Sequence, residues 1–401
     1  MQNVAKLHLE FQETTIKGDL LFLVFPKLIS EATIIKVFLT ERDEQSNQFI
    51  LDDQSYEVID NPNTNYELFE EIKPSIRQLN LNFHQENINF CENAYKLAKG
   101  FQYLPQLQIL KLQITNQHVS LDQYKQIFLD LSKLQELTQI DLLICDNMSS
   151  TQIVGDGFQD SEIFVQEIQL NNLAKSISFA QSLQSFYLDI TNLQIQDEFV
   201  LKLGQSLSKL ASINELRLHF SENKITDKGI SSICFAIEQL MQLEQISISL
   251  QNNYITESGY LHLKNSLQKK ITLKNLDQDF KWNRDELNIP NNFAEILVFE
   301  NNSIRNLELN LRVFNQLNQN IVDQIAKSIQ QSKNIETLII DAEKSFFTLS
   351  SSKKPLPVSD LKQLKRLIIF SDLSHDENRQ VKKYIVRKSL RLIELIITNY
   401  F

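Results

Sequence analysis

The sequence has little glycine, proline or cysteine, and each scarcity removes a class of protein. Glycine and proline number 7 each among 401 residues, which excludes collagen-like, glycine-linker and proline-rich chains. The three cysteines, Cys91, Cys145 and Cys234, lie far apart and form no CxxC pair. Their spacing excludes a zinc ribbon and a dense disulfide framework, and it fits a reducing compartment.

Long hydrophobic runs are also missing. The longest early apolar run, Leu20 to Phe25, stops at Pro26, far short of the roughly 20 residues that a membrane helix needs. Glu10 and Glu13 precede any apolar run, so no secretory signal is predicted. Acidic residues outnumber basic ones by 50 to 40, a net charge of −10, which disfavours nucleic acid as a partner. We expect a cytoplasmic protein without membrane contact.

What the sequence does contain is a period of about thirty residues. One clear unit begins at Ile213 with INELRLHF and continues through Asn223, and the next begins at Leu243 with LEQISISL and continues through Asn253. The period predicts a single domain over residues 1–401 with about 12 to 13 repeats. The other repeat starts are Val4, Ile34, Ile76, Leu107, Leu137, Leu183, Leu273, Ile304, Ile335, Leu364 and Leu392.

Each unit combines two periodicities. The leucines of the first half alternate with other residues, which predicts a short strand with one buried face. The second half of the clear unit has Ile230, Ile233 and Ile237 at helical spacing, after Thr226 and Asp227, which can cap a helix. A single unit cannot bury its apolar side, so the units must stack. The predicted fold class is an α/β solenoid, a horseshoe with a parallel sheet on its concave side and helices on its convex side.

This repeat resembles the leucine-rich repeat of the ribonuclease-inhibitor type along nearly the whole chain. The resemblance implies that Asn223 and Asn253 bond backbone groups across the bend that follows each strand. In this chain the Asn stands two residues later than is usual in the family. The resemblance also implies binding of other proteins along the inner face.

Two units are too long, which predicts surface insertions at about 41–71 and 145–170. From Glu41 to Glu71 there are ten Asp or Glu and one Arg. The only GxG, Gly155 to Gly157, lies in the second insertion without dinucleotide-binding spacing. No P-loop, metal-binding histidine pair or nucleophile motif occurs, so we predict no catalytic, cofactor or metal site.

Side chains between the leucines should line the concave face. Near the middle, Tyr187, Asp189, Arg217 and His219 have the residue types that anchor protein interfaces. Towards the C-terminus the face becomes apolar, which suggests a covered surface. A register error of one residue would instead place these side chains on the buried face. The apolar candidates are Ile339, Ile368, Phe370 and Ile396.

Two further contacts are predicted. From Lys362 to Arg391 there are nine Lys or Arg against three Asp or Glu. Within that segment a basic patch either forms a solvated helix face or contacts an acidic surface of protein or RNA; it consists of Lys382, Lys383, Arg387 and Lys388. Repeats begin by Val4 and continue almost to Phe401 without polar caps, so we also expect at least one of these ends to dock on another subunit. The alternative is that Tyr400 and Phe401 fold back as a minimal lid.

The sequence therefore predicts a non-catalytic scaffold for protein–protein interaction. The expected setting is a large cytoplasmic assembly, cytoskeletal or ciliary, because relatives of this repeat type often act there. The alternative is a Ran-type GTPase-activating protein, which is also built from these repeats; its family usually has an acidic C-terminal tail, whereas this segment is basic. A ubiquitin-ligase recognition subunit finds no support, because we expect no helical domain before the first repeat.

Overall fold

A computed structural model of the chain confirms the alternation of parallel strands and helices. It describes residues 7–11, 34–39, 77–83, 106–114, 128–144, 170–279, 303–310, 327, 329, 333–341, 361–371, 374–388 and 392–398. The first insertion, nearly all of the second, and two cysteines, Cys91 and Cys145, lie outside these residues. The chain divides into two compact units, Met1–Ile195 and Gln196–Phe401. The prediction of one continuous domain stays a prediction.

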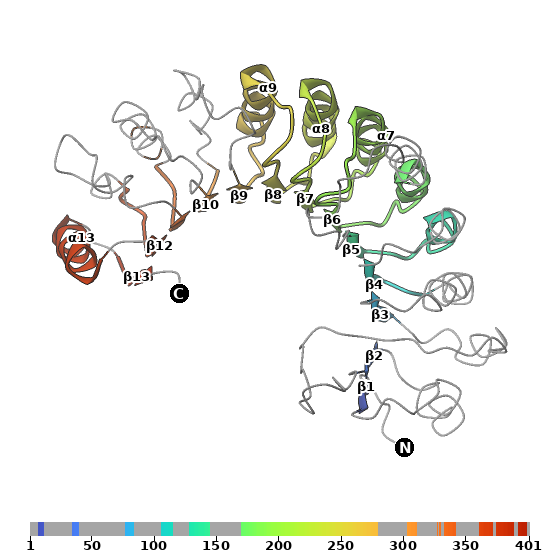
Figure 1. The fold of residues 1–401 in the computed structure, drawn as a ribbon, viewed down its shortest axis with the longest axis horizontal. Helices are drawn as coiled ribbons and strands as arrows, with labels where there is room; N and C mark the ends of the chain where they lie inside the picture. Colours follow the sequence, from blue (N-terminus) through green and yellow to red (C-terminus); the bar gives the residue numbers. More distant parts are fainter. Residues whose placement is uncertain are drawn as a thin grey trace, which may run out of the picture. The chain divides into compact units, whose positions relative to one another are not determined.

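Each predicted repeat contributes one strand, and within each unit the strands follow one another in chain order (Figure 1). The first unit contains β1 (Leu7–Phe11), β2 (Ile34–Leu39), β3 (Gln78–Phe83), β4 (Ile109–Ile114), β5 (Gln139–Ile144) and β6 (Ser185–Asp189). The second contains β7 (Glu215–His219), β8 (Gln245–Ser249), β9 (Asn275–Asp279), β10 (Asn306–Asn310), β11 (Thr337–Asp341), β12 (Arg366–Phe370) and β13 (Glu394–Thr398).

The expected register is correct except in the second repeat. The predicted repeat starts at Val4 and Ile34 would place His8 opposite Phe38, but His8 lies opposite Lys36. Lys36 in turn lies opposite Asn80. The repeat start at Ile34 is therefore wrong by two residues. The cause is the nearly continuous apolar run of β2, which fits the alternating pattern in either position. A shift of two keeps every side chain on its own face, so the sequence pattern does not detect it.

The helices of the described residues include α7 (Asp197–Leu207), α8 (Asp227–Gln239), α9 (Glu257–Gln268) and α13 (His375–Lys388). The predicted cap of α8 is confirmed, because the Thr226 side chain accepts a hydrogen bond from the backbone N–H of Lys228 at 3.3 Å. The predicted apolar positions of this helix, Ile230, Ile233 and Ile237, are buried. Helices α7, α8 and α9 lie side by side along one face of the strands β7–β9 (Figure 1).

The core of the second unit lies between these helices and the sheet. On β7 the side chains of Leu216 and Leu218 are buried, whereas Glu215, Arg217 and His219 between them are partly or fully exposed. Packed helices need about 8–10 Å of separation and paired strands only about 4.8 Å. Each repeat of this group is therefore wider at its helix than at its strand.

The asparagine role implied by the family resemblance is confirmed at the bends after β7 and β8. Asn253 accepts a hydrogen bond from the backbone N–H of Ile225 at 3.0 Å and donates to the Phe220 carbonyl at 2.8 Å. Asn223 likewise donates to the Phe220 carbonyl at 3.0 Å. These buried amides satisfy backbone groups that the turn leaves without a strand partner.

Candidate functional site

The open face of the sheet is the candidate site. We define it as the face that points away from the helices, and on it one side chain per strand falls into a lateral row. Pairing of neighbouring strands fixes this central row in the second unit, so each member lies beside the next. The central row consists of Arg217, Ser247, Asp277, Glu308, Ile339, Ile368 and Ile396.

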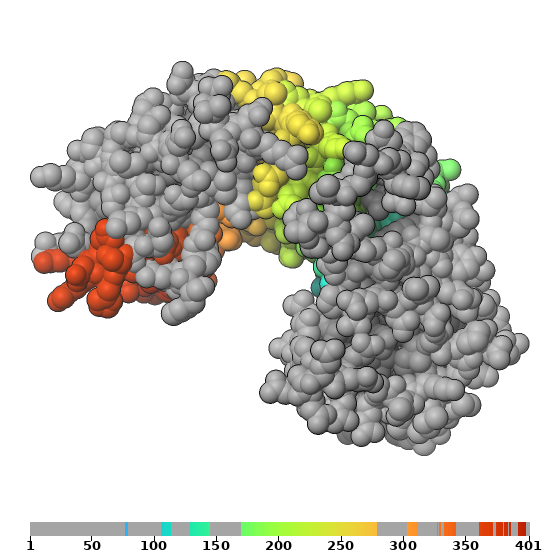
Figure 2. Space-filling view, viewed as in Figure 1, coloured from blue at the N-terminus to red at the C-terminus, as the bar shows by residue number. Residues whose placement is uncertain are grey.

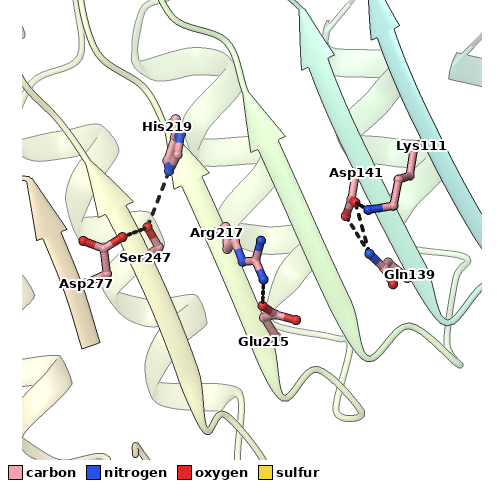
Figure 3. Close-up of polar contacts among 8 residues, drawn as sticks. All are labelled: Lys111, Gln139, Asp141, Glu215, Arg217, His219, Ser247 and Asp277. Carbon is pink, nitrogen blue, oxygen red and sulfur yellow. Dashed lines mark hydrogen bonds and ion pairs between the residues drawn. The ribbon is translucent and has the colours of Figure 1, made fainter. Parts of the chain in front are cut away.

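Two members of the row, Ser247 and Asp277, and His219 of the neighbouring row are linked by polar contacts across three strands (Figure 3). The Ser247 hydroxyl donates to Asp277 Oδ2 at 2.7 Å, and His219 Nε2 lies 3.4 Å from Ser247 Oγ. The order of contacts is histidine, serine, aspartate. In a hydrolytic triad the aspartate orients the histidine and the histidine takes the serine proton. Here the serine hydroxyl donates its hydrogen bond to the carboxylate and not to the histidine, so this group has the geometry of a structural bridge.

The predicted group of Tyr187, Asp189, Arg217 and His219 is divided between the two units. In the first unit the Tyr187 hydroxyl donates to Asp189 Oδ2 at 3.2 Å, and the other carboxylate oxygen accepts from the Thr191 hydroxyl at 2.7 Å. In the second unit Arg217 forms an ion pair with Glu215 on its own strand. The structure thus places all four residues on strands and joins Tyr187 to Asp189.

The first unit carries a second polar group on its open face (Figure 3). Lys111 on β4 forms an ion pair of 2.5 Å with Asp141 on β5. Gln139 donates to both oxygens of the same carboxylate at 3.1 and 3.0 Å. The Lys111 side chain is 44% exposed, so the pair adds little stability and leaves the lysine accessible.

Three carboxylates form a cluster that the sequence analysis did not single out. Glu308 on β10 lies beside Asp277 of β9, and Asp341 follows on β11. Partial desolvation of the Glu308 carboxyl, and the like charges of Asp277 and Asp341, raise its pKa above the ordinary value. The sequence shows acidic residues at corresponding positions of neighbouring repeats. Only the pairing of the strands shows that these residues lie close together.

The apolar candidates lie together as expected. Ile339, Ile368 and Ile396 are consecutive members of the central row, and Phe370 lies between Asp341 and Thr398 in the next row. The side chains of Ile339, Ile368 and Phe370 are partly exposed, and Ile396 is 39% exposed. A one-residue register error is thereby excluded, because the alternate residues Leu338, Leu367 and Ile369 are the buried ones.

This architecture decides the fold. One parallel strand recurs about every thirty residues, helices pack on one face, and an asparagine satisfies the bend. The chain has the α/β leucine-rich-repeat fold.

Comparison with known proteins adds remote likenesses. No family model matches the sequence, and no curated protein is significantly similar to it. A leucine-rich repeat-containing protein of Legionella pneumophila, LegL7, has 12% identity and a TM-score of 0.38, over 80% of this chain and 90% of that one. A Listeria monocytogenes internalin has 13% identity and a TM-score of 0.27, over 84% and 89%. A chain of the yeast Rad7 and Elc1 complex has 14% identity and a TM-score of 0.43, over 83% and 74%.

The basic patch lies on the last described helix of the leucine-rich-repeat chain. Lys382 and Lys383 are exposed on α13, and Arg387 and Lys388 follow on the same helix, with side chains outside the described residues. A capping box starts this helix, because Ser374 Oγ donates to Glu377 Oε2 at 2.6 Å while the Glu377 backbone N–H lies 3.4 Å from Ser374 Oγ. The predicted helix is confirmed, and its contact with an acidic surface stays a prediction.

The one described cysteine, Cys234, is buried. Burial raises the pKa of the Cys234 thiol to about 12, and a thiol needs its ionised form to react. Among the described residues no group of three His, Cys, Asp or Glu side chains could hold a metal ion. None of the described helices is long and apolar enough to cross a membrane.

Proposed function

We propose that this protein is a non-catalytic scaffold that binds other proteins along the open face of its second unit. The repeats would be of the ribonuclease-inhibitor type, and the setting a cytoplasmic assembly, cytoskeletal or ciliary. The observation that carries the proposal is the apolar part of the central row. Ile339, Ile368 and Ile396 line up on three adjacent strands and remain partly exposed beside Phe370.

Physical chemistry supports a covered surface at this point. Exposed apolar side chains that lie in contact with one another are unfavourable in water, and soluble proteins concentrate them at interfaces. The strands beneath them are paired on a rigid sheet, so a partner would not have to order this surface on binding. Both properties favour protein recognition over catalysis.

The test is affinity recovery from native extract, followed by mass spectrometry. Wild type is compared with the double variant Ile368→Asp and Phe370→Asp, and with a control that adds the same charge at Gln245 and Asn306, also on the open face. We expect the first variant to lose the partners that the control keeps. Equal recovery by two variants that melt like the wild type would contradict the proposal.

A GTP hydrolysis assay with a Ran GTPase separates the scaffold from the alternative. A scaffold leaves the rate of hydrolysis unchanged. Acceleration would instead support a GTPase-activating protein and reject the non-catalytic function.

We also propose that α13 contacts an acidic protein surface through Lys382, Lys383, Arg387 and Lys388. Charge contacts of exposed lysines weaken as salt screens them. Charge reversal at Lys382 and Lys383 should remove a distinct, salt-sensitive subset of the recovered proteins. If no recovered protein depends on these lysines, the helix face is solvated only.

A further inference from the structure

The central row changes its chemical character along its length. It is acidic on β9 and β10, at Asp277 and Glu308, and apolar on β11, β12 and β13, at Ile339, Ile368 and Ile396. The acidic part is widened by Asp341 in the neighbouring row. One continuous strip of the surface therefore offers negative charge at one end and a hydrophobic contact at the other.

The acidic end presents its three carboxylates on the open face. Partial desolvation of the Glu308 carboxyl, together with the like charges of Asp277 and Asp341, raises its pKa. The two arginines described on the open face of this unit are engaged by other carboxylates. Arg217 pairs with Glu215 and Arg366 pairs with Glu394. A cation brought by a partner would relieve the repulsion that the fold leaves in place.

The dimensions of the strip suit one short segment of a partner. Adjacent strands lie about 4.8 Å apart, so the four steps from Asp277 to Ile396 span about 19 Å. A helix rises 1.5 Å per residue, so about thirteen helical residues cover this length. A single amphipathic segment can thus reach both ends.

We propose that the central row binds a segment of another protein that carries Lys or Arg at one end and large apolar side chains at the other. The basic end lies over Asp277 and Glu308, and the apolar end lies over Ile339, Ile368 and Ile396. The inference rests on the proposed scaffold function and names the class of partner.

A second copy of this chain fits the strip less well. Its α13 would supply Lys382 and Lys383, but the apolar residues Val381 and Ile385 of that helix are buried in their own fold. It would neutralise the acidic end and leave the isoleucines uncovered. A foreign segment that bears both kinds of side chain satisfies the whole strip.

The test starts from selection of displayed random 14-residue peptides on the full chain. Enriched peptides are synthesised, and their affinities are measured by fluorescence anisotropy. We expect them to combine Lys or Arg with apolar residues. The double variant Asp277→Asn and Glu308→Gln should weaken binding about tenfold or more, and added salt should weaken binding to the wild type.

The matched control is Glu198→Gln with Glu222→Gln, which removes the same charge from residues off the sheet. It should bind like the wild type. If Ile368→Asp abolishes binding while the Asp277 and Glu308 variant binds normally, the face binds proteins but the basic class of partner is wrong. If none of these variants changes binding, the scaffold face itself is wrong. Sedimentation could show that the wild type self-associates and that the variant Asp277→Asn with Glu308→Gln does not. The occupant of the strip would then be a second copy of this chain and not a foreign segment.

Discussion

Asp197, the first residue of α7, caps the helix of the next repeat through Thr226. Its Oδ2 accepts a hydrogen bond from the Thr226 hydroxyl at 2.6 Å, and its Oδ1 accepts from the backbone N–H of Thr226 at 2.8 Å and of Gly229 at 3.1 Å. Asp227 repeats the arrangement one unit later, where the backbone N–H of Thr256 donates to its Oδ1 at 2.7 Å. The starts of α8 and α9 thus each depend on a carboxylate of the repeat before.

Asp197→Ala should lower the free energy of unfolding by about 2–3 kcal/mol, because it leaves donors at the start of α8 without their charged acceptor. Urea denaturation measures the change. Asp376→Ala, in the first turn of α13, is a control with a small expected effect. A loss at Asp197 no larger than the control loss would show that water replaces the carboxylate.

Gly204→Ala should destabilise the contact between α7 and α8. A Cβ on Gly204 would lie 2.6 Å from the backbone oxygen of Ser232, so the two helices must move apart. Overpacking of this kind costs about 1–3 kcal/mol, which exceeds the gain of about 0.5–1 kcal/mol that alanine brings inside a helix. Gln205→Ala, at the exposed neighbour, should be close to neutral. A Gly204 variant as stable as the wild type would contradict the close approach.

Glu222→Asn should stabilise the chain by about 0.5–1 kcal/mol. Glu222 has φ 59°, in the left-handed region, and the same position in neighbouring repeats is held by Asn192 with φ 60° and Asn252 with φ 55°. Asparagine tolerates this conformation better than glutamate does. Thermal melting reports the change, and Glu222→Gln separates the backbone effect from loss of charge. Equal melting of the Asn and Gln variants would reject the conformational explanation.

Glu308→Gln should raise stability at neutral pH and have less effect in acid. The pKa of this carboxyl is higher in the folded state than the ordinary value of 4.5, so the folded chain holds the proton more tightly. Its contribution to the unfolding free energy therefore falls as pH rises above that ordinary value. The variant lacks this pH-dependent cost. Urea denaturation at a series of pH values upwards from that ordinary value of 4.5 should show a difference from wild type that grows with pH. A constant difference would mean that neither desolvation nor repulsion from Asp277 and Asp341 raises the pKa of this carboxyl in the folded chain.

The sequence was sufficient for the strands because a period of two and a period of thirty reinforce each other. It was sufficient for the apolar end of the central row, since Ile339, Ile368 and Ile396 occupy the same position in successive repeats. It was not sufficient for β2, where nearly every residue is apolar and two registers fit equally well.

The polar contacts were beyond the sequence for a different reason. Asp197 reaches Thr226 across 29 residues, and Ser247 reaches Asp277 across 30. Hydrogen-bonding residues are common at such positions, and only the lateral register decides which of them meet. The Glu308 cluster needed the same information, together with the desolvation that follows from packing.

Each strand gives a single side chain to the central row, and roughly thirty residues of scaffold separate one contribution from the next. If this row binds a partner as proposed, its specificity can consequently change one residue at a time. Exchanging one residue on β10 or β12 alters what the strip attracts while the helices behind it, and the caps that hold them, stay as they were. Such a chain can acquire a new partner through a few isolated substitutions without refolding.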